Sequence, residues 1–325
     1  MKIKYLICFI FLIVMILKIT SDKNEQESPK LDKINVFCFA DNENILAACT
    51  MITSLICNVT ENREIDIYAV HFEDKPMSNS NIKKIEMLKT SIRNFNLIFV
   101  PFSRKKIERF NTGTHNPSTL IKLYCAEILP NQIKKALWLN EDTIVNSKID
   151  KLYDTNLRGK YIAATEQKEE REKYLNASIF SPFSKWITAA VVLFNLNSIR
   201  KENVQNKFEK KCEFYSNNLK NLENIEHKSI EEYAINTVIS EEKFVEFGIE
   251  NCLMTNFNKK YFEHYKNETK NARILYYNDH KNKPWSKESR NKINKYFLKI
   301  WDSYFKKTPF FDNKLVKIGF EEVKK

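Results

Sequence analysis

Three polar residues interrupt an apolar stretch of the chain that runs from Leu137 to Val145. The apolar residues before them predict a buried strand that ends at Leu139, and Asn140, Glu141 and Asp142 follow it directly. Polar side chains at the carboxyl end of a buried strand are typical of ligand sites in α/β proteins. We therefore expect a ligand or metal site at this strand end.

The composition limits what kind of site this can be. Only 4 of the 325 residues are glycine, and neither glycine-rich fingerprint for phosphate binding is present. Nucleotide-binding loops built on glycine are thus excluded. With 43% hydrophobic and 29% charged residues, the chain is globular and long enough to bury one large core.

The formal net charge is +12, from 53 basic and 41 acidic residues. This balance fits a solvated lysine-rich surface, and it also fits attraction to phosphorylated substrates or anionic lipid headgroups. The basic residues are spread along the chain and no nucleic-acid-binding motif is present, so we expect no nucleic acid as a partner.

The amino terminus is typical of a segment that directs a protein to a membrane. Lys2 and Lys4 precede an uncharged apolar run from Tyr5 to Leu17, which has the length of a signal-peptide core and is short for a membrane span. We interpret residues 1–19 as a signal anchor or a signal peptide and residues 20–33 as a polar stem. Both alternatives predict the secretory pathway, and an uncleaved anchor predicts a membrane-associated, single-pass type II protein.

Cysteine spacing indicates neither a zinc knuckle nor a redox motif, because none of the 7 cysteines forms a C-x-x-C pair. Cys38, Cys49, Cys57 and Cys125 fall in apolar segments and are expected in the core. Cys212 and Cys252 are open to two interpretations: they either form a disulfide or are two free thiols.

From residue 34 onward, apolar runs alternate with helical periodicity. We predict strands at residues 34–40, 65–70, 97–101, 136–139, 161–164, 189–196 and 273–277. We predict helices at residues 45–57, 81–93, 118–129, 198–215, 229–239 and 287–306. This order predicts an α/β fold with a mainly parallel central sheet flanked by helices.

We expect one domain over residues 34–285 and a C-terminal helical extension over residues 286–325, because the composition does not change after residue 33. The basic, amphipathic helix in this extension either closes the core or rests on anionic lipid.

Several segments occur in an order that resembles glycosyltransferase family 8. They are Phe39-Ala-Asp-Asn-Glu-Asn44, Thr119-Leu-Ile-Lys-Leu123, Leu139-Asn-Glu-Asp142, Trp186–Leu196, Ile230–Asn236 and Lys283-Pro-Trp285. This family includes bacterial lipopolysaccharide glucosyl- and galactosyltransferases and glycogenin. The resemblance implies a GT-A fold, a UDP-hexose donor, Mn²⁺ and retention of configuration at the anomeric carbon.

The resemblance assigns five residues to nucleotide-sugar binding. Ala40 and Asp41 fall in the family's first-strand motif, where Asp41 would contact the uracil-ribose end. The alternative for Asp41 is a helix N-cap. Lys122 replaces an arginine that faces the phosphates, and Lys283 would hold the diphosphate. Thr188 replaces an asparagine of the sugar pocket.

The family's L-D-x-D motif aligns with the segment that ends at Asp142. The resemblance therefore implies Mn²⁺ held by Asp142, with Asn140 as a weakened ligand in a degenerate motif. The family's third ligand, a histidine, corresponds to Tyr277, whose neutral phenol is a poor ligand. Asp279 and His280 are candidate replacements, because they lie nearby in the sequence.

Two glutamates are the candidate catalytic residues. Glu232 takes the place of the family's glutamine beside the anomeric carbon, where a carboxylate could stabilise an oxocarbenium-like state or act as a nucleophile. Its alternative is an exposed helix glutamate. Glu166 falls where the family carries an acid near the acceptor. His115 matches a family histidine, and a structural role is its alternative.

These implications predict transfer of a hexose from a UDP-sugar to a hydroxyl group of a glycan, lipid or protein acceptor. The first alternative is a catalytically inactive family member that binds a nucleotide-sugar, a glycan or a partner protein. The second is a membrane-attached interaction module unrelated to sugars. Binding of UDP, with or without turnover, separates the three.

Overall fold

A computed structural model describes residues 33–113, 115–167, 185–218, 230–239, 243–256 and 266–318. Residues 1–32, which carry the predicted anchor and almost all of the stem, lie outside these ranges, so those assignments stay predictions. Helices within the ranges are all too short or too polar to cross a membrane.

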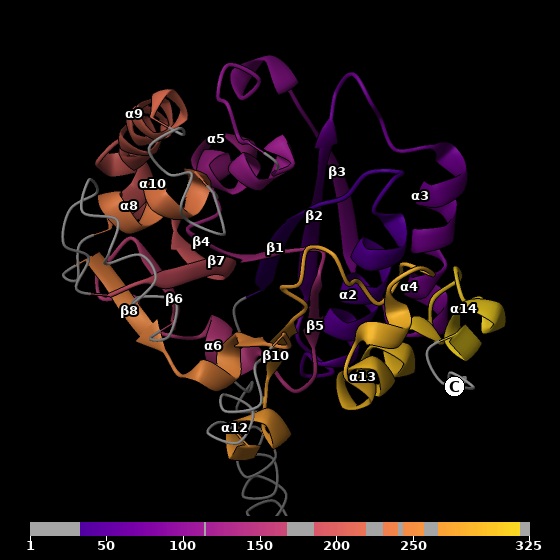
Figure 1. Cartoon of the computed structure of the whole chain (residues 1–325). Helices are drawn as coiled ribbons and strands as arrows, with labels where there is room; N and C mark the ends of the chain where they lie inside the picture. The colour runs from indigo at the N-terminus through magenta and orange to yellow at the C-terminus, as the bar shows by residue number, and fades with distance from the viewer. Residues whose placement is uncertain are drawn as a thin grey trace, which may run out of the picture. The chain divides into compact units, whose positions relative to one another are not determined.

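A mainly parallel sheet forms the centre of the described part of the chain (Figure 1). Its strands lie in the order β3 (Asn96–Phe102), β2 (Ile65–Phe72), β1 (Ile34–Phe39), β4 (Lys135–Leu139), β7 (Ile187–Asn195), β6 (Ile162–Glu166) and β8 (Phe244–Phe247). Each neighbouring pair is parallel except the two pairs of β7, which runs antiparallel to β4 and β6. The carboxyl ends of β1, β4 and β6 and the amino end of β7 therefore share one edge of the sheet, here called the carboxyl edge.

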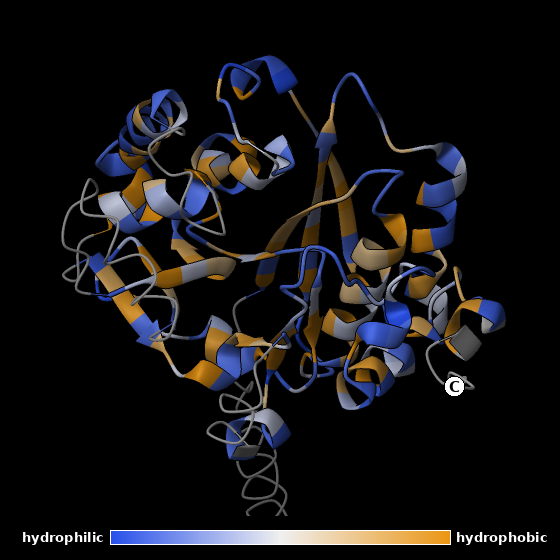
Figure 2. Ribbon diagram, in the orientation of Figure 1, coloured by the Kyte–Doolittle hydropathy of each residue, from blue (hydrophilic) through white to orange (hydrophobic). Residues whose placement is uncertain are grey.

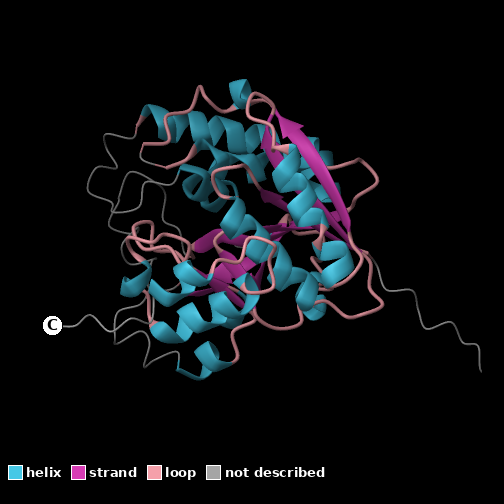
Figure 3. Ribbon diagram, turned by 90° about the vertical axis from the view of Figure 1, so that its right-hand side faces the viewer, coloured by secondary structure: helices cyan, strands magenta, loops and turns pink. Residues whose placement is uncertain are grey.

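Both faces of this sheet are buried, and alternate side chains of each strand enter different cores. Phe37 of β1 and Trp138 of β4 point to one core, whereas Val36 and Leu137 point to the other. Burial on both faces explains why these strands appear in the sequence as nearly continuous apolar runs. Figure 2 shows hydrophobic residues concentrated on the central strands, and Figure 3 shows helices on both sides of them.

One face is covered by η2 (Pro117–Tyr124), α5 (Cys125–Ile128), α8 (Leu196–Lys201), α9 (Val204–Asn217) and α10 (Ile230–Val238). The amide of Asn236 joins α10 to β7, because it accepts from the backbone N–H of Ile187 at 2.8 Å and donates to its carbonyl at 3.0 Å. The face of α10 that contains Asn236 is thereby held against the amino end of β7.

The opposite face is covered by α2 (Ile45–Cys57), α3 (Asn79–Glu86), α4 (Leu88–Ser91) and α6 (Asp150–Tyr153). Nearly every residue of α2 is buried, because the helix packs against the sheet and also against α13 (Lys295–Phe305). After α2, the amide of Asn58 donates to the Val145 carbonyl at 2.9 Å and to the Tyr304 hydroxyl at 2.8 Å. These bonds tie the helix to β5 (Thr143–Val145) and to α13.

A second, smaller sheet has the order β5, β10 (Ile274–Tyr276) and β9 (Leu253–Met254). Phe297, Trp301 and Phe305 of α13 enter a third core with Ile144 and Leu275 of this sheet. The predicted C-terminal extension therefore closes the core, which was one of its two interpretations. The remaining short elements are η1 (Arg104–Lys106), η5 (Ile249–Asn251), α12 (Lys266–Lys270), η6 (Arg290–Lys292) and α14 (Asn313–Ile318).

Four predicted helices differ from the observed ones. The helix predicted over 81–93 is divided into α3 and α4, and the helix predicted over 287–306 is reduced to α13, which follows the 3₁₀ turn η6. The other two differences have identifiable reasons. Asn203 adopts a left-handed conformation with φ 47° and separates α8 from α9, since asparagine tolerates this region. The segment predicted as a helix over 118–129 is largely the 3₁₀ helix η2. It ends at Leu129, which Pro130 forces into an extended conformation (φ −93°, ψ 142°).

The structure also decides between the two interpretations of the late cysteines. Cys212 and Cys252 are buried free thiols in the cores on opposite faces of the large sheet, where they cannot form a disulfide with each other.

Candidate active site

The polar tip after β4 lies where the two sheets meet, at the carboxyl edge. Asn140 donates its backbone N–H to the Ala190 carbonyl of β7 at 2.9 Å, and its own carbonyl accepts from the Thr143 N–H at 3.1 Å. The chain then turns into β5 of the small sheet. The Tyr277 N–H donates to the Asp142 carbonyl at 2.9 Å, so the loop after β10 begins beside the tip.

This loop brings Lys283 onto the side chain of Asp142. The ammonium of Lys283 lies 2.7 Å from Asp142 Oδ2 and donates to the Tyr277 carbonyl, also at 2.7 Å. It lies 5.6 Å from the centre of the Trp285 ring. The other carboxylate oxygen, Asp142 Oδ1, is buried and has no hydrogen-bond partner among the described residues.

The side chain of Asn140 points toward the first core. Its Oδ1 accepts from the indole Nε1 of Trp138 at 2.6 Å and from the ammonium of Lys122 at 3.3 Å. Both partners can only donate, so the amide oxygen must face them. Its Nδ2 group, which donates no hydrogen bond to any described residue, is the polar end left for the pocket.

Lys122 is fully enclosed behind this residue. Its ammonium donates to the Ala189 carbonyl at 3.0 Å and lies 4.0 Å from the Glu231 carboxylate. Only 1% of the lysine is exposed. Lys122 therefore does not line the pocket, and Asn140, to which it donates, lies between the two.

Glu232 lies at the amino end of β7. Its Oε1 accepts from the Thr188 hydroxyl at 3.2 Å and from the Ala189 N–H at 3.1 Å. Burial, together with the nearby carboxylates of Asp142 and Glu232, raises the pKa of the Tyr276 phenol well above its ordinary value.

A pocket of about 740 Å³ opens beside the tip. The predicted residues in its wall are Asn140, Asp142, Lys283, His115, Asp279 and His280. Among the other lining residues are Asn116, Asn256, Tyr276, Asn278 and Lys281. Glu141 also lines it, and burial followed by the charge of Asp142 raises the pKa of Glu141 to about 7.

The remaining predicted residues lie at the carboxyl edge but outside this pocket's described lining. Ala40 is buried at the end of β1, and Asp41 Oδ1 accepts from the backbone N–H groups of Glu43 and Asn44 at 3.0 and 2.8 Å. Asp41 thus shapes the turn into α2. Glu166, at the end of β6, is buried and lies 3.8 Å from the Lys185 ammonium.

The donor set does not fit the manganese site that the resemblance implies. The Asn140 oxygen is turned away toward two donors. Tyr277 is only 1% exposed, and its hydroxyl donates to the Phe297 carbonyl at 2.7 Å. Asp279 uses both oxygens within its own turn, on Lys281 and Asn282. In the described ranges, no three His, Cys, Asp or Glu side chains are grouped to hold a metal.

Sequence reasoning missed three features of the site. The first is Trp138, which donates to Asn140, and the second is Glu231, which is buried behind Lys122. Neither belongs to a motif that would have indicated its role. His115 and His280 pack edge to face, with ring centres 5.2 Å apart, across the pocket wall. Glu232, in contrast, was predicted; it lies four residues before Asn236, so both are on the helix face that meets β7.

The GT-A fold and a polar pocket at the end of β4 define a nucleotide-sugar transferase architecture. The sequence profile of Glycosyl transferase family 8 matches residues 35–289. The chain belongs to glycosyltransferase family 8, as its motifs predicted, and it has the GT-A fold that the family resemblance implied.

Two curated bacterial proteins are similar in sequence. Glycosyltransferase GlyF of Streptococcus pneumoniae serotype 4 is 24% identical over 159 residues, which cover 47% of this chain and 37% of GlyF. General stress protein A of Bacillus subtilis is 21% identical over 160 residues, which cover 48% of this chain and 54% of that protein. The matched region thus spans about half of these relatives or less.

A solved structure of galactosyltransferase LgtC in complex with donor and acceptor sugar analogues aligns with a TM-score of 0.68. The alignment has 14% sequence identity and covers 88% of this chain and 100% of LgtC. Similarity at this level of identity shows the shared GT-A fold.

Proposed function

We propose that this chain transfers a hexose from a UDP-sugar to a hydroxyl group of a glycan, lipid or protein acceptor, with retention at the anomeric carbon. The observation that carries this proposal is the 2.7 Å contact between Asp142 and Lys283. It joins the tip of β4 to the Lys-Pro-Trp loop, 141 residues later, in the wall of one pocket.

In this proposal, the predicted residues act at different parts of the donor and acceptor. Lys283 holds the β-phosphate, Ala40 and Asp41 lie at the nucleoside end, and Thr188 and Glu232 flank the sugar. The bond from the anomeric carbon to the phosphate oxygen breaks, and UDP leaves with the bonding electrons. The acceptor oxygen forms the new bond while its proton passes to the departing phosphate. A carboxylate at Glu232 stabilises the positive charge that develops on the sugar, and Glu166 lies toward the acceptor.

The experiment is donor turnover by the purified full chain. Labelled UDP-glucose and UDP-galactose are incubated with the protein and a panel of sugar, lipid and peptide acceptors, and release of UDP is measured. Transfer or hydrolysis above that of a Glu232→Ala variant supports the proposal. Binding of UDP without release from either donor contradicts it.

A specific observation favours a second candidate, a relative that binds a nucleotide-sugar without turnover. Asn140 and Tyr277 replace two of the three metal ligands implied by the family resemblance. The same turnover experiment decides between the candidates, because this one predicts donor binding with no release of UDP.

We also propose that residues 1–19 attach the chain to a membrane of the secretory pathway, supported by the two lysines and apolar run at the amino terminus. Sequencing of the amino terminus after expression tests this: an intact Met1 in the membrane fraction supports an anchor. A soluble, intact chain contradicts membrane attachment.

A further inference from the structure

The pocket contains donors at the positions where a cation's ligands would be expected. Asn140 keeps only an N–H₂ group toward the pocket, because Trp138 and Lys122 occupy its oxygen. An amide N–H is a donor for a phosphate oxygen and cannot ligate a metal. At this position, therefore, the chemistry suits an anion directly.

The carboxylate of Asp142 already has a cation beside it. The Lys283 ammonium lies 2.7 Å from Oδ2, and only 16% of the lysine side chain and 13% of the aspartate side chain are exposed. A charge pair so shielded from water is screened weakly by solvent and salt. The ammonium is thus held at the point where the strand tip faces the pocket, with two of its three N–H groups bonded and one left for an anion.

The lysine is also held in place from behind. Its backbone N–H donates to the Ser289 hydroxyl at 3.2 Å, and the buried guanidinium of Arg290 contacts both the Pro284 carbonyl and the carboxylate of Asp302 on α13. The loop that carries the ammonium is therefore fixed to the closing helix, and little ordering is needed when an anion binds.

We propose that this site binds the diphosphate of its nucleotide donor with the Lys283 ammonium and the Asn140 amide in place of a divalent cation. This inference rests on the proposed function, because it names how the donor of that reaction is held. A lysine can stabilise the negative charge of a diphosphate as a point charge, although it lacks the bidentate geometry of arginine. Asp142 is then the ion-pair partner of the lysine rather than a metal ligand, and the loop anchored by Ser289 and Arg290 keeps the lysine in position.

The test is calorimetry of UDP and UMP binding to the full chain, in EDTA and in excess Mn²⁺. We expect the UDP dissociation constant to agree within about twofold between the two conditions. We also expect UDP to bind at least about tenfold more tightly than UMP in EDTA, since the second phosphate contributes a charge-assisted contact. A Lys283→Met variant should lose this preference.

A charge-matched control is Lys287→Met, which removes an exposed lysine outside the pocket lining and should keep the preference. Asp142→Asn separates the two mechanisms by the sign of its effect. If the lysine replaces the metal, removing this carboxylate leaves UDP affinity in EDTA unchanged or raises it, because repulsion of the phosphate is relieved. If the aspartate binds a metal, Asp142→Asn abolishes the binding that Mn²⁺ supports.

Three results would overturn the inference. The first is UDP affinity that falls at least about tenfold in EDTA and is restored by Mn²⁺. The second is loss of UDP binding by Asp142→Asn while its thermal midpoint is unchanged. The third is absence of UDP binding in both conditions, which overturns the proposed function as well and is thereby distinguished from the first two.

Discussion

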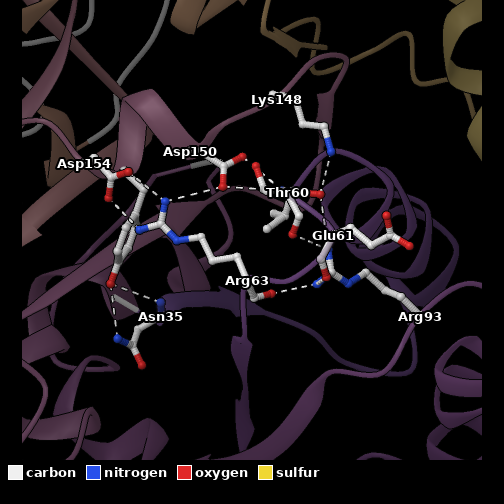
Figure 4. Close-up of polar contacts among 10 residues, drawn as sticks. Asn35, Thr60, Glu61, Arg63, Arg93, Lys148, Asp150 and Asp154 are labelled. Atoms are coloured by element: carbon white, nitrogen blue, oxygen red, sulfur yellow. Dashed lines mark hydrogen bonds and ion pairs between the residues drawn. The ribbon is translucent and has the colours of Figure 1, made fainter. Parts of the chain in front are cut away.

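The two ends of the central strands differ in how completely their polar groups are bonded. At the amino end, Arg63 lies between Asp150 and Asp154 (Figure 4). Its side chain is fully buried and donates to both oxygens of Asp154, at 2.7 and 2.5 Å, and to Asp150 at 3.4 Å. The Thr60 N–H donates to the second oxygen of Asp150 at 3.1 Å.

Further bonds complete this amino-edge network. Arg93 donates to four backbone carbonyls, those of Val59, Thr60, Glu61 and Arg63. Lys148 donates to the Val59 carbonyl at 2.7 Å, and the Tyr153 hydroxyl accepts from Asn35 and donates to the Lys135 carbonyl. The side chains of Arg63, Arg93, Lys148 and the two aspartates are all bonded, and this network stabilises the fold at the amino edge.

The carboxyl edge uses similar residues and leaves them incomplete. Asp142 Oδ1 and Glu231 Oε2 are buried without a hydrogen-bond partner in the described part of the structure, and Asn140 Nδ2 makes no bond there. Buried polar groups are nearly always satisfied in folded proteins, and the exceptions often mark functional sites. The comparison teaches that the same kinds of basic and acidic groups are bonded to one another at the amino edge, whereas the carboxyl edge leaves buried carboxylate oxygens without partners in the described residues.

The largest effect is expected at Glu232. Glu232→Ala removes the carboxylate that accepts from the Ala189 N–H, and sugar transfer should fall by about 10²- to 10⁴-fold. The rate of UDP-hexose turnover and the thermal midpoint are measured together. Glu213→Ala, at an exposed glutamate on α9, is the control and should change neither. Turnover by Glu232→Ala within about threefold of wild type contradicts a catalytic role.

Removal of Arg63 should affect stability alone. Arg63→Ala leaves two carboxylates without their buried partner and is expected to lower the free energy of unfolding by about 2–4 kcal/mol. Urea denaturation measures this loss, and UDP affinity should stay within about twofold. Arg109→Ala, an exposed ion pair with Glu209, should cost less than about 1 kcal/mol. A similar loss of unfolding free energy in Arg63→Ala and Arg109→Ala would contradict a special role of the amino-edge network in stability.

Glu141 should make the carboxyl edge sensitive to pH. Its folded-state pKa of about 7 lies above the ordinary value of 4.5, so folding favours the protonated form. This contribution to stability is present at low pH and is lost as pH rises through 7. The free energy of unfolding of Glu141→Gln, relative to that of wild type, should therefore rise by about 1–2 kcal/mol when the pH is raised from 5 to 8. Urea denaturation at both values checks this, and an equal difference at both pH values contradicts it.

Restoring a carboxylate at position 140 should produce the smallest change. Asn140→Asp places a second acidic group beside Asp142 and should tighten Mn²⁺ binding in the presence of UDP by roughly fivefold. Asn278→Asp adds the same charge elsewhere in the pocket lining and is the matched control. Calorimetry with Mn²⁺ measures both variants. Equal gains in the two variants would mean that charge alone, rather than position, attracts the metal.

Much of the fold could be predicted because burial on both faces makes a strand visible as an apolar run. The segments that became β1, β2 and β4 are such runs, and α2 is apolar on nearly all sides. β9 and β8 were not predicted. The first has two residues and the second four, too few for a periodic pattern. The break at Asn203 depends on a single backbone angle that the helical pattern does not encode.

The sequence identified several residues that lie together in the structure, but it did not predict how they contact one another. Asp142 and Lys283 could each be found from a motif, but their contact depends on how β10 aligns with β5. The orientation of the Asn140 amide was not predictable, because it is set by Trp138 on the same strand face and by Lys122 from a different element. The direction in which the Asn140 oxygen points therefore follows from tertiary packing rather than from spacing in the sequence.

The most direct measurement is the phosphorus NMR spectrum of UDP with the full chain in EDTA, because it reports on the β-phosphate itself. The account predicts that the β-phosphorus resonance shifts on addition of wild-type protein without any divalent cation, and that Lys283→Met removes this shift while Lys287→Met keeps it. A β-phosphorus resonance that moves only when Mg²⁺ is added would contradict a lysine in place of the metal.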